Sequence, residues 1–231
     1  MIIDSEKVRT ASIKSGLPRH IEAVIALAGL VMVAPLIALA AIAIAVTSRG
    51  PVIFRQKRMG RKGRPFTMYK LRTMRVTNSG PQVTAGDDTR VTPIGKFLRK
   101  TKLDELPELW NILKGDMSLI GPRPEVPRYI DLEDPVWRLV LEARPGITDP
   151  MTLRLRNEEA LLVEVEGDRE RFYIETLLPF KLEGYLDYLQ ARSWRSDLKV
   201  LWQTIVAVAF PYKAPLPTLE EIQSYTIRHR R

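Results

Sequence analysis

Two adjacent carboxylates, Asp104 and Glu105, are the residues of this sequence best suited to do chemistry. They stand at the start of a segment whose apolar residues recur at helical spacing, and Glu108 follows one turn later. Pro107 falls in the first turn of this predicted helix, where proline is tolerated. Because the free amides and dipole of a helix N-terminus stabilise carboxylates, acidic residues are also common there for structural reasons alone. Residue type and spacing therefore leave both a structural and a chemical role open.

Basic side chains accompany these carboxylates along the sequence. Lys70 and Arg72 lie two residues apart on a predicted strand, so they would point to one face. Arg123 stands between two prolines that hold its backbone stiff. Carboxylates can bind Mg²⁺ and so neutralise a diphosphate, while Lys and Arg hold its outer oxygens, and an aspartate can attack phosphorus to give an acyl phosphate. The cluster is therefore typical of phosphate chemistry. Its other charged members are Arg99, Lys100, Lys102 and Asp116.

The composition narrows this chemistry further. The 231 residues suffice for one domain with its own core, and a hydrophobic content of 45% excludes a disordered chain. The absence of cysteine excludes disulfides and thiolate nucleophiles. Only two histidines exist, His20 and His229, both near the ends of the chain, which disfavours a histidine-based metal site or a Ser-His-Asp relay. A formal net charge of +9 indicates anionic partners: nucleic acid, acidic lipid or phosphorylated substrates. The P-loop and G-x-G-x-x-G motifs are missing, which disfavours a P-loop NTPase or a Rossmann dehydrogenase.

Residues 21–48 are almost wholly apolar and predict a membrane helix. The helix would be about 42 Å long, and about 20 residues suffice to span a bilayer core. Pro35, near its middle, removes a backbone donor, so we expect a kink. Basic residues on both flanks favour a cytoplasmic location for both ends. A re-entrant helix broken at Pro35 and a single kinked crossing both remain open. The flanking residues are Lys7, Arg9, Lys14 and Arg19 before the segment, and Arg49, Arg55, Lys57, Arg58, Arg61, Lys62 and Arg64 after it.

The remaining segments predict an α+β fold that is mainly helical. Strands over 52–56 and 66–71 would form a small β-hairpin, with the basic stretch 57–64 as its connection. Turn-forming residues predict a loop over 77–92. Segment 195–210, with Tyr212 just beyond it, is either an amphipathic helix in the membrane interface or a buried core helix. Further helical patterns occupy 94–98, 103–113, 135–142, 157–167 and 169–191.

Seven ordered motifs lie between about residue 20 and residue 210. They are Gly50–Gln56, Pro65–Met74, Asp88–Gly95, Leu103–Asn111, Lys114–Glu125, Arg144–Thr148 and Ser196–Leu198. In combination they closely resemble the bacterial sugar transferase family, the small monotopic polyprenyl-phosphate phosphoglycosyl transferases. The combination is long and ordered, so the resemblance is specific.

The resemblance implies roles for individual residues. Asp104 would be the nucleophile, and Glu105 would help to bind Mg²⁺ or position the site, with both carboxylates as metal ligands. The Pro-Arg-Pro loop at Arg123 would hold the nucleotide-sugar, and Pro35 would break a re-entrant membrane helix. Further substrate-binding residues implied by the family positions are Lys70, Arg72, Arg90 and Asp197.

The sequence departs from the family pattern in three places. Ala34 stands where many members have serine before the break proline, so a hydroxyl that could satisfy a freed carbonyl is missing. Glu108 stands where many have glutamine, and Asp149 where many have glycine. The segment 149–162 is where we expect the sugar preference to be encoded.

Together, the implied roles describe a two-step transfer. Asp104 would attack the sugar-side phosphorus of a UDP-sugar, UMP would leave, and a polyprenyl (undecaprenyl) phosphate would then take the phosphosugar from Asp104. The product would start polysaccharide or glycoconjugate assembly at the cytoplasmic face of the bacterial inner membrane. Membrane lipids would be further partners, and a homodimer is left open. The implied layout is a polar segment (1–20), the membrane helix (21–48), a catalytic domain (49–213) surrounded by amphipathic interfacial helices, and a C-terminal tail (214–231).

Two other functions compete with this hypothesis. A membrane-tethered basic scaffold, binding acidic lipid or nucleic acid without catalysis, would explain the net charge and predicts salt-sensitive binding. It does not explain the carboxylates, so we predict no nucleic-acid partner. A transferase that moves the sugar alone would release UDP instead of UMP.

Overall fold

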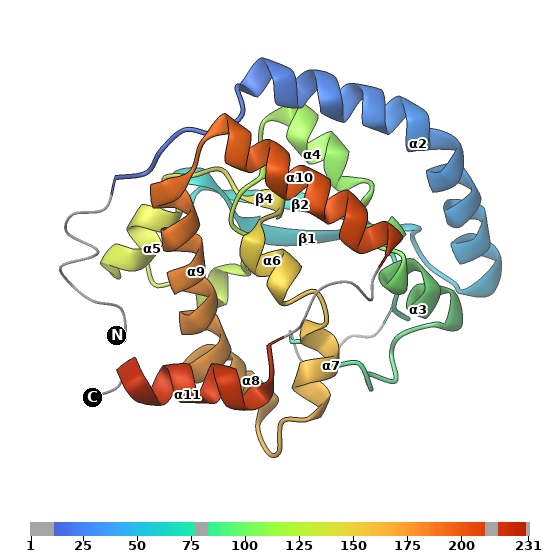
Figure 1. Ribbon diagram of the computed structural model, residues 1–231. Helices are drawn as coiled ribbons and strands as arrows, with labels where there is room; N and C mark the ends of the chain where they lie inside the picture. Colours follow the sequence, from blue (N-terminus) through green and yellow to red (C-terminus); the bar gives the residue numbers. More distant parts are fainter. Residues whose placement is uncertain (1–11, 77–82, 211–216, 230–231) are drawn as a thin grey trace.

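A computed structural model describes residues 12–76, 83–210 and 217–229 of the chain, with side chains up to 224 in the last range. The flanking residues Lys7 and Arg9, part of the predicted 77–92 loop, and Tyr212 lie outside these described residues. The fold is mainly helical with two small sheets (Figure 1). Its helices and strands are α2 (Arg19–Thr47), β1 (Ile53–Met59), β2 (Pro65–Leu71), α3 (Pro93–Lys100), α4 (Glu108–Lys114), β3 (Ser118–Ile120), α5 (Pro135–Val140), β4 (Gly146–Thr148), α6 (Pro150–Arg154), α7 (Glu158–Val163), α8 (Arg169–Phe172), α9 (Leu178–Ala191), α10 (Trp194–Ala209) and α11 (Leu219–His229).

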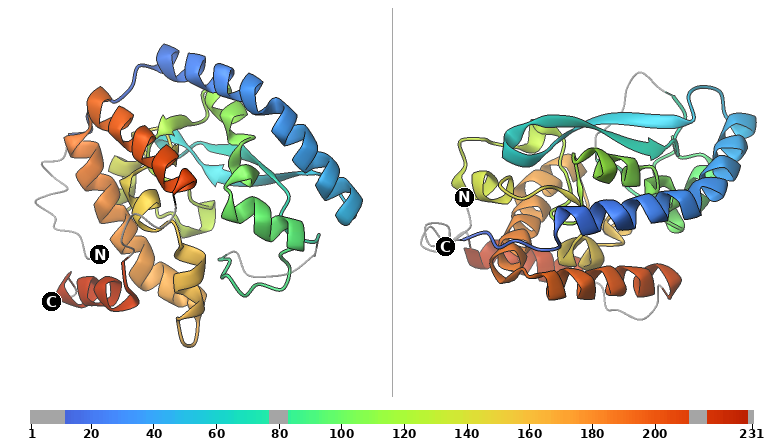
Figure 2. Two further views of the ribbon diagram at one scale, coloured as in Figure 1. Left: turned by 45° about the vertical axis from the view of Figure 1, so that its right-hand side comes forward. Right: turned by 90° about the horizontal axis from the view of Figure 1, so that it is seen from above.

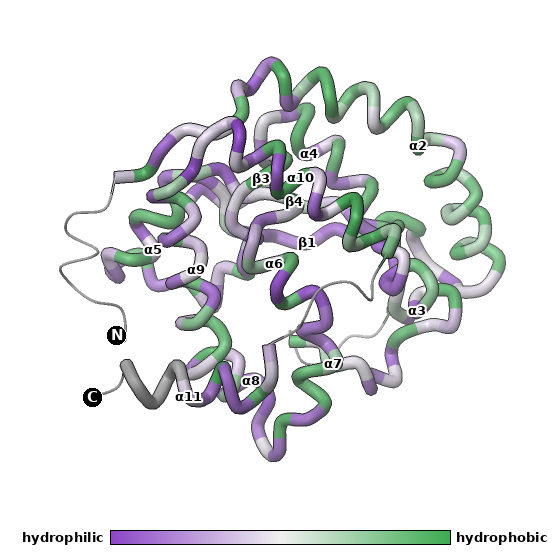
Figure 3. Tube along the Cα trace, in the orientation of Figure 1, coloured by the Kyte–Doolittle hydropathy of each residue, from purple (hydrophilic) through white to green (hydrophobic). Residues whose placement is uncertain are grey.

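The predicted apolar helix is present as α2, a helix of 29 residues that continues through Pro35. Figure 1 shows that it bends along its length, and Figure 3 shows that it is hydrophobic almost throughout. By length and composition it could cross a membrane, and only 6% of its most apolar stretch is buried inside the protein. Because most of its apolar side chains face outward, α2 is unlike the core helix of a soluble protein.

Both halves of α2 nevertheless pack on the same body of the protein. In the first half, Ala26 is fully buried in a core cluster with Phe66 and Ile112. In the second half, Ile44 packs in another cluster with Leu71 and Leu98. A straight helix that left the body after one half could not make both sets of contacts. The bend at the middle of α2 therefore keeps the whole helix on one face of the protein.

Polar contacts fix both ends of α2 to the rest of the fold. The buried carboxylate of Glu22 accepts hydrogen bonds from the hydroxyl of Ser118 and from the backbone N–H of Leu119, the latter at 3.1 Å. At the other end, Nη2 of Arg72 donates to the backbone oxygen of Ser48 at 2.8 Å and to its hydroxyl at 3.0 Å. Arg72 thus caps the C-terminus of α2 by donating hydrogen bonds to oxygen atoms of its last cap residue.

The predicted hairpin is confirmed, with longer strands than expected. β1 and β2 pair antiparallel, with Gln56 opposite Met68 in the register. Asn111 of α4 is fully buried and ties the hairpin to this helix. Its side-chain oxygen accepts from the N–H of Tyr69 at 3.1 Å, and its nitrogen donates to the oxygen of Thr67 at 2.7 Å. These bonds hold the end of β2 against α4.

A second, parallel pair of short strands was not predicted. In it, β3 and β4 align Ile120 with Thr148. The backbones approach so closely that a Cβ atom on Gly146 would lie 2.2 Å from the nitrogen of Gly121, so both positions require glycine. The contact fixes the start of the loop that carries Arg123.

The C-terminal half supplies the largest core cluster, which contains residues of α5, α6, α7, α9 and α11. The helix predicted over 169–191 is present, but a π-helical turn at Tyr173–Leu177 interrupts it between α8 and α9. The segment described as a tail contains α11, whose Ile222 is fully buried in this core. The tail is therefore packed on the domain, at least through this helix.

Helix α10 exposes its apolar face. It starts with a capping box between Ser193 and Ser196, and only Asp197 and Val200 along its length are buried. Trp202 is 66% exposed. This exposure excludes the buried-core alternative for 195–210. Seen from above, α10 lies on the opposite side of the molecule from the hairpin (Figure 2). The exposed apolar residues, at helical spacing, are Trp194, Leu198, Trp202, Ile205 and Val208.

Candidate active site

The two adjacent carboxylates lie in a tight turn, because Leu103–Glu105 form a 3₁₀ turn and α4 begins only at Glu108. The prediction that they occupy the first turn of the helix was therefore wrong, because they lie in a separate 3₁₀ turn that precedes α4. Pro107, which cannot donate an N–H, stands at the N-cap. Lys102, just before the turn, has a left-handed backbone with φ 58°, which is costly for a residue with a side chain. Strain of this kind is frequent at functional sites.

Asp104 is 7% exposed, and its Oδ1 atom is buried without a hydrogen-bond partner among the described residues. Burial, followed by the charge of Glu105, raises the pKa of Asp104 above its ordinary value. A buried carboxylate oxygen that no protein group satisfies calls for an explanation, and a ligand or metal ion is a common one. In this turn, the Oδ1 atom of Asp104 is therefore the one available to bind a ligand.

Glu105 is held by two cations. Lys70 Nζ lies 2.8 Å from its Oε1, and Arg123 Nη2 donates to the same oxygen. Burial alone would raise the pKa of Glu105, but the charges of Arg123 and Lys70 outweigh it and hold this pKa well below its usual range. Neighbouring carboxylates whose pKa values are pushed in opposite directions are typical of sites that assign them different roles.

Glu108, the first residue of α4, is the third carboxylate of the cluster. Its side chain is 1% exposed, and Lys70 Nζ lies 3.2 Å from Glu108 Oε1, an ion pair without hydrogen-bond geometry. Burial raises the pKa of Glu108, while Lys70 opposes this shift. One lysine from the end of β2 therefore neutralises parts of two carboxylates, and its ammonium group links β2 to the turn before α4.

The other predicted substrate-binding residues have different neighbours. Arg90 forms an ion pair with Asp88, 2.6 Å between Nη2 and Oδ2, at the edge of the same cleft. Arg72 follows the end of β2 and binds the end of α2, so it does not share the contacts of Lys70. Asp197 is fully buried, where it accepts from Arg192 at 2.8 Å and from the N–H of Leu17 at 2.8 Å. Its contacts anchor the start of α10.

A cleft of about 2690 Å³ joins the carboxylates to the apolar helices. Asp104, Glu105 and Arg123 line its polar part. Part of its apolar lining comes from α2 and α10, the two helices with exposed apolar faces. The cleft could therefore hold a ligand with a charged head and a hydrocarbon tail. The apolar residues from these helices are Ile25, Leu201, Ile205, Ala207 and Val208.

A second polar cluster, which the sequence analysis missed, lies on the same cleft. Lys181 is 3% exposed and donates to Glu125 at 2.7 Å and to the hydroxyl of Tyr173 at 2.9 Å. Its Nζ also lies 3.5 Å from Oε2 of Glu158, and the hydroxyl of Tyr185 is buried nearby. We call these five residues the Lys181 cluster. Two of them carried a sequence signal: Glu125 ends one of the motifs, and Glu158 lies in the segment 149–162, where sugar preference was expected.

The side chains of the turn suit Mg²⁺ as part of a shared site. Asp104 and Glu105 offer hard oxygen donors, and Oδ1 of Asp104 is free within the described part of the chain. Across those same residues no group of three or more histidine, cysteine or acidic side chains could enclose a metal ion. Mg²⁺ is commonly bound by one or two carboxylates together with substrate phosphates and water. The donor set therefore fits Mg²⁺ only with a phosphorylated ligand present.

The sequence is similar to those of known bacterial proteins. The sequence profile of the family described as "Bacterial sugar transferase" matches residues 13–211. The UDP-glucose:undecaprenyl-phosphate glucose-1-phosphate transferase of Caulobacter vibrioides is 40% identical over 178 residues, covering 74% of this chain and 62% of that protein. The protein of the same name from Escherichia coli is 34% identical over 196 residues, covering 82% of this chain and 39% of that protein.

A third relative is named for a different sugar. The UDP-N-acetylgalactosamine-undecaprenyl-phosphate N-acetylgalactosaminephosphotransferase of Aeromonas hydrophila is 41% identical over 135 residues, covering 56% of this chain and 32% of that protein. The chain thus spans 62% or less of the length of each of these three relatives.

Proposed function

The chain belongs to the bacterial sugar transferase family, and on that premise we propose that it transfers a phosphosugar from a UDP-sugar to undecaprenyl phosphate. The observation that carries this proposal is the buried Oδ1 of Asp104, which has no hydrogen-bond partner among the residues that the structure describes. It lies beside Glu105 in a cleft that runs from cations to apolar helices. The relatives support it, since their names combine a UDP-sugar with undecaprenyl phosphate.

The chemistry would proceed in two displacements. An Asp104 oxygen forms a bond to the sugar-side phosphorus, the bond from that phosphorus to the bridging oxygen breaks, and UMP leaves with that oxygen. An oxygen of undecaprenyl phosphate then attacks the same phosphorus and releases the Asp104 carboxylate. Arg123 and Lys70 stabilise the charge on the phosphoryl oxygens in both steps. Asp104 must be ionised to attack, which its position next to these cations permits.

Asp104 and Glu105 would hold Mg²⁺, which when bound neutralises diphosphate charge. The charges of Arg123 and Lys70 lower the pKa of Glu105 and so favour the ionised form that a metal ligand needs. Removal of divalent cations with EDTA is expected to abolish UMP release, and added Mg²⁺ is expected to restore it. Undiminished release in EDTA would contradict a metal at this site.

We further propose that α2 is re-entrant and that the catalytic body lies on the cytoplasmic face of the bacterial inner membrane. The bent helix packs on the body through both halves, which supports a return to the same face. The exposed apolar face of α10 would lie in the membrane interface beside it. The cleft between these helices would then admit a lipid phosphate from the membrane and a nucleotide from water.

Incubation of the protein with a UDP-sugar, without lipid, tests the covalent step. We expect UMP release and a phosphosugar adduct on Asp104, both lost in Asp104→Asn. Asp168→Asn is the matched control, because Asp168 is exposed and asparagine can replace it as the cap of α8, so this variant should behave as the wild type. Full turnover by Asp104→Asn would overturn the covalent mechanism, and release of UDP would favour transfer of the sugar alone.

The scaffold hypothesis receives no support from the relatives, whose names are those of transferases. It also leaves the buried carboxylates of the turn without a role. Binding of the protein to acidic vesicles or nucleic acid, without any UMP release across UDP-sugars, would be the result that favours it.

A further inference from the structure

We propose that Glu158 and Tyr185 form a sugar-recognition subsite, in which their carboxylate and hydroxyl groups hydrogen-bond the ring hydroxyls of the donor sugar. The inference rests on the proposed function, because the ligand is the sugar of the UDP-sugar. Relatives of this chain are named for glucose and for N-acetylgalactosamine, so some part of the fold must distinguish sugars. Neither residue belongs to the carboxylate turn.

Lys181 holds this part of the cleft in place. It donates to Glu125 and Tyr173, and the Tyr173 hydroxyl donates to Glu125 at 2.6 Å, so these three groups satisfy one another. Glu158 stands outside this triangle, with Oε2 at 3.5 Å from the lysine nitrogen and a side chain that is 28% exposed. Its carboxylate is oriented by charge and keeps acceptor capacity toward the cleft.

Tyr185 supplies the second group. Its side chain is 1% exposed, and its hydroxyl is buried with no hydrogen-bond partner in the described part of the structure. The residue also lines the cleft. A buried hydroxyl without a partner costs stability, so a native protein rarely keeps one unless something else satisfies it. A hydroxyl can both donate to and accept from a sugar hydroxyl.

The position of Glu158 places the sugar next to the reacting phosphorus. Glu158 and Arg123 line the same cleft, and Oε2 of Glu158 lies 3.5 Å from Nζ of Lys181, which also binds Glu125, two residues after Arg123. A second carboxylate there would repel phosphate but would accept hydrogen bonds from a neutral hydroxylated ring. In the proposed reaction the phosphorus that meets Asp104 carries the sugar, so the sugar, rather than the ribose, is expected to occupy this position.

The test compares UMP release from UDP-glucose, UDP-galactose, UDP-N-acetylglucosamine and UDP-N-acetylgalactosamine by the full-length protein in detergent. For Glu158→Gln we expect KM for the preferred donor to rise about tenfold, with kcat nearly unchanged, and the preference over its C4 epimer to fall about tenfold. Tyr185→Phe should likewise show a smaller preference for the preferred donor over its C4 epimer. Because its hydroxyl has no hydrogen-bond partner among the described residues, this variant should keep the wild-type Tm.

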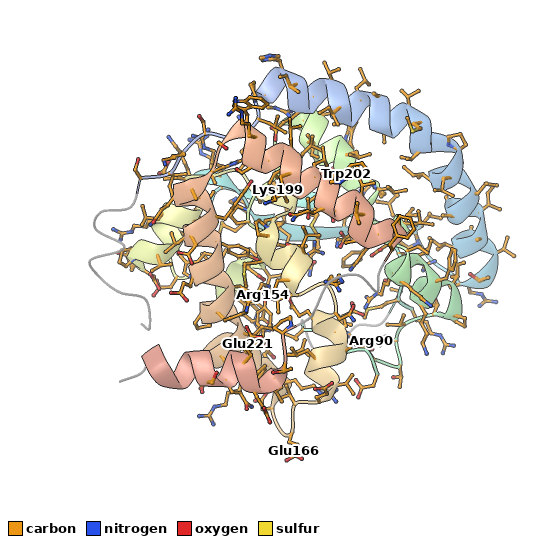
Figure 4. All side chains as sticks on the ribbon, in the orientation of Figure 1. Arg90, Arg154, Glu166, Lys199, Trp202 and Glu221 are labelled. Atoms are coloured by element: carbon orange, nitrogen blue, oxygen red, sulfur yellow. The ribbon has the colours of Figure 1, made fainter. Side chains whose placement is uncertain are left out.

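Glu166→Gln is the matched control, since Glu166 is exposed at the tip of the loop after α7 (Figure 4) and does not line the cleft. Equal loss of activity on all four donors in Glu158→Gln would indicate a structural role and overturn the inference. Unchanged sugar preference with weaker inhibition by UMP would assign the residue to the ribose and also overturn it. A wild type that releases no UMP from any donor would overturn the proposed function and the subsite together.

Discussion

At the scale of single residues, the acidic turn divides its charges unequally. Asp104 and Glu105 are neighbours in sequence, yet the cations reach only the second of them by hydrogen bonds. Burial raises the pKa of Asp104, and the nearby positive charges hold that of Glu105 well down. The site therefore favours the ionised form of Glu105 and leaves an oxygen of Asp104 without a hydrogen-bond partner among the described residues.

The pH dependence of UMP release follows from this division. Asp104 must be ionised to react, so activity should fall as the pH drops through its raised pKa, at a higher pH than for an ordinary aspartate. Lys70→Met removes a charge that lowers this pKa, so the acid limb of the pH–rate profile should move to still higher pH. At neutral pH the rate should fall about 100-fold, because a charge aimed at the phosphoryl oxygens is lost.

Lys114→Met is the control for this experiment, since Lys114 pairs with Asp116 at the surface. Its profile should match that of the wild type. An acid limb that stays in place in Lys70→Met would contradict the electrostatic coupling between Lys70 and Asp104.

At the scale of elements, the N-cap of α6 combines a helix-stabilising contact with a buried charge. Asp149 caps α6, where its Oδ1 accepts from the N–H of Met151 at 2.7 Å and of Thr152 at 3.2 Å. It is also 1% exposed, and burial raises its pKa from 3.8 to about 6 despite these bonds. The cap therefore stabilises the helix start at the cost of a buried charge at neutral pH.

This cap should make stability depend on pH. The folded protein binds the Asp149 proton more tightly than the unfolded chain does. The protonated side chain therefore contributes fully to the free energy of unfolding below pH 3.8, and this contribution is lost as the pH rises through about 6. The full loss amounts to about 3 kcal/mol. Asp149→Asn keeps a good cap and removes the charge. Its Tm should exceed that of the wild type at neutral pH and vary less across this window.

Asp168→Asn is the matched control, because Asp168 caps α8 in the same manner but is exposed. Thermal unfolding in detergent across pH values measures both variants. If Asp149→Asn melted below the wild type at neutral pH, the assignment of a buried charge penalty would be incorrect.

The attachment of α2 to β3 gives a second prediction at this scale. Glu22→Ala leaves the Ser118 hydroxyl and the Leu119 N–H buried without their acceptor, which should cost about 1–3 kcal/mol. Glu22→Gln keeps one acceptor oxygen and should recover most of that loss. Tm values in detergent would show the difference, and equal values for the alanine variant and the wild type would rule out a stabilising contact.

At the scale of the whole molecule, the apolar surfaces decide how the protein meets the membrane. Exposed apolar residues continue along α2 and α10, and both helices border the cleft. Brominated lipids should therefore quench Trp202 of α10, which lies on the outer side with Lys199 (Figure 4). Trp202→Phe should lower the quenched fraction of fluorescence, whereas Trp137→Phe should raise it, because Trp137 is only 5% exposed. Equal effects of both variants would contradict the interfacial position.

The course of α2 can be tested because the chain has no cysteine, so any introduced thiol is unique. Ser15→Cys reports the position before α2, and Lys57→Cys the hairpin after it. In intact cells and inverted vesicles, an impermeant reagent should label both from the cytoplasmic side if α2 is re-entrant. Labelling from opposite sides would establish a single crossing.

The sequence alone determined the elements whose cause is local. The apolar run 21–48, the hairpin strands and the helical periods of 195–210 depend on neighbouring residues, and each is present close to its predicted bounds. The motifs also identified the family, which the profile over 13–211 confirmed. In contrast, the start of α4 was misplaced, since the left-handed backbone of Lys102 depends on the contacts around it.

The tertiary structure decided which charges meet. Lys70 and Arg123 come to Glu105 through the packing of β2 and of the loop after β3, whereas Arg72, two residues from Lys70, turns to the end of α2. Lys181 meets Glu125 across 56 residues of chain. No sequence spacing encodes such contacts, because burial, and the long-range packing that produces it, sets the partners and the pKa of each group.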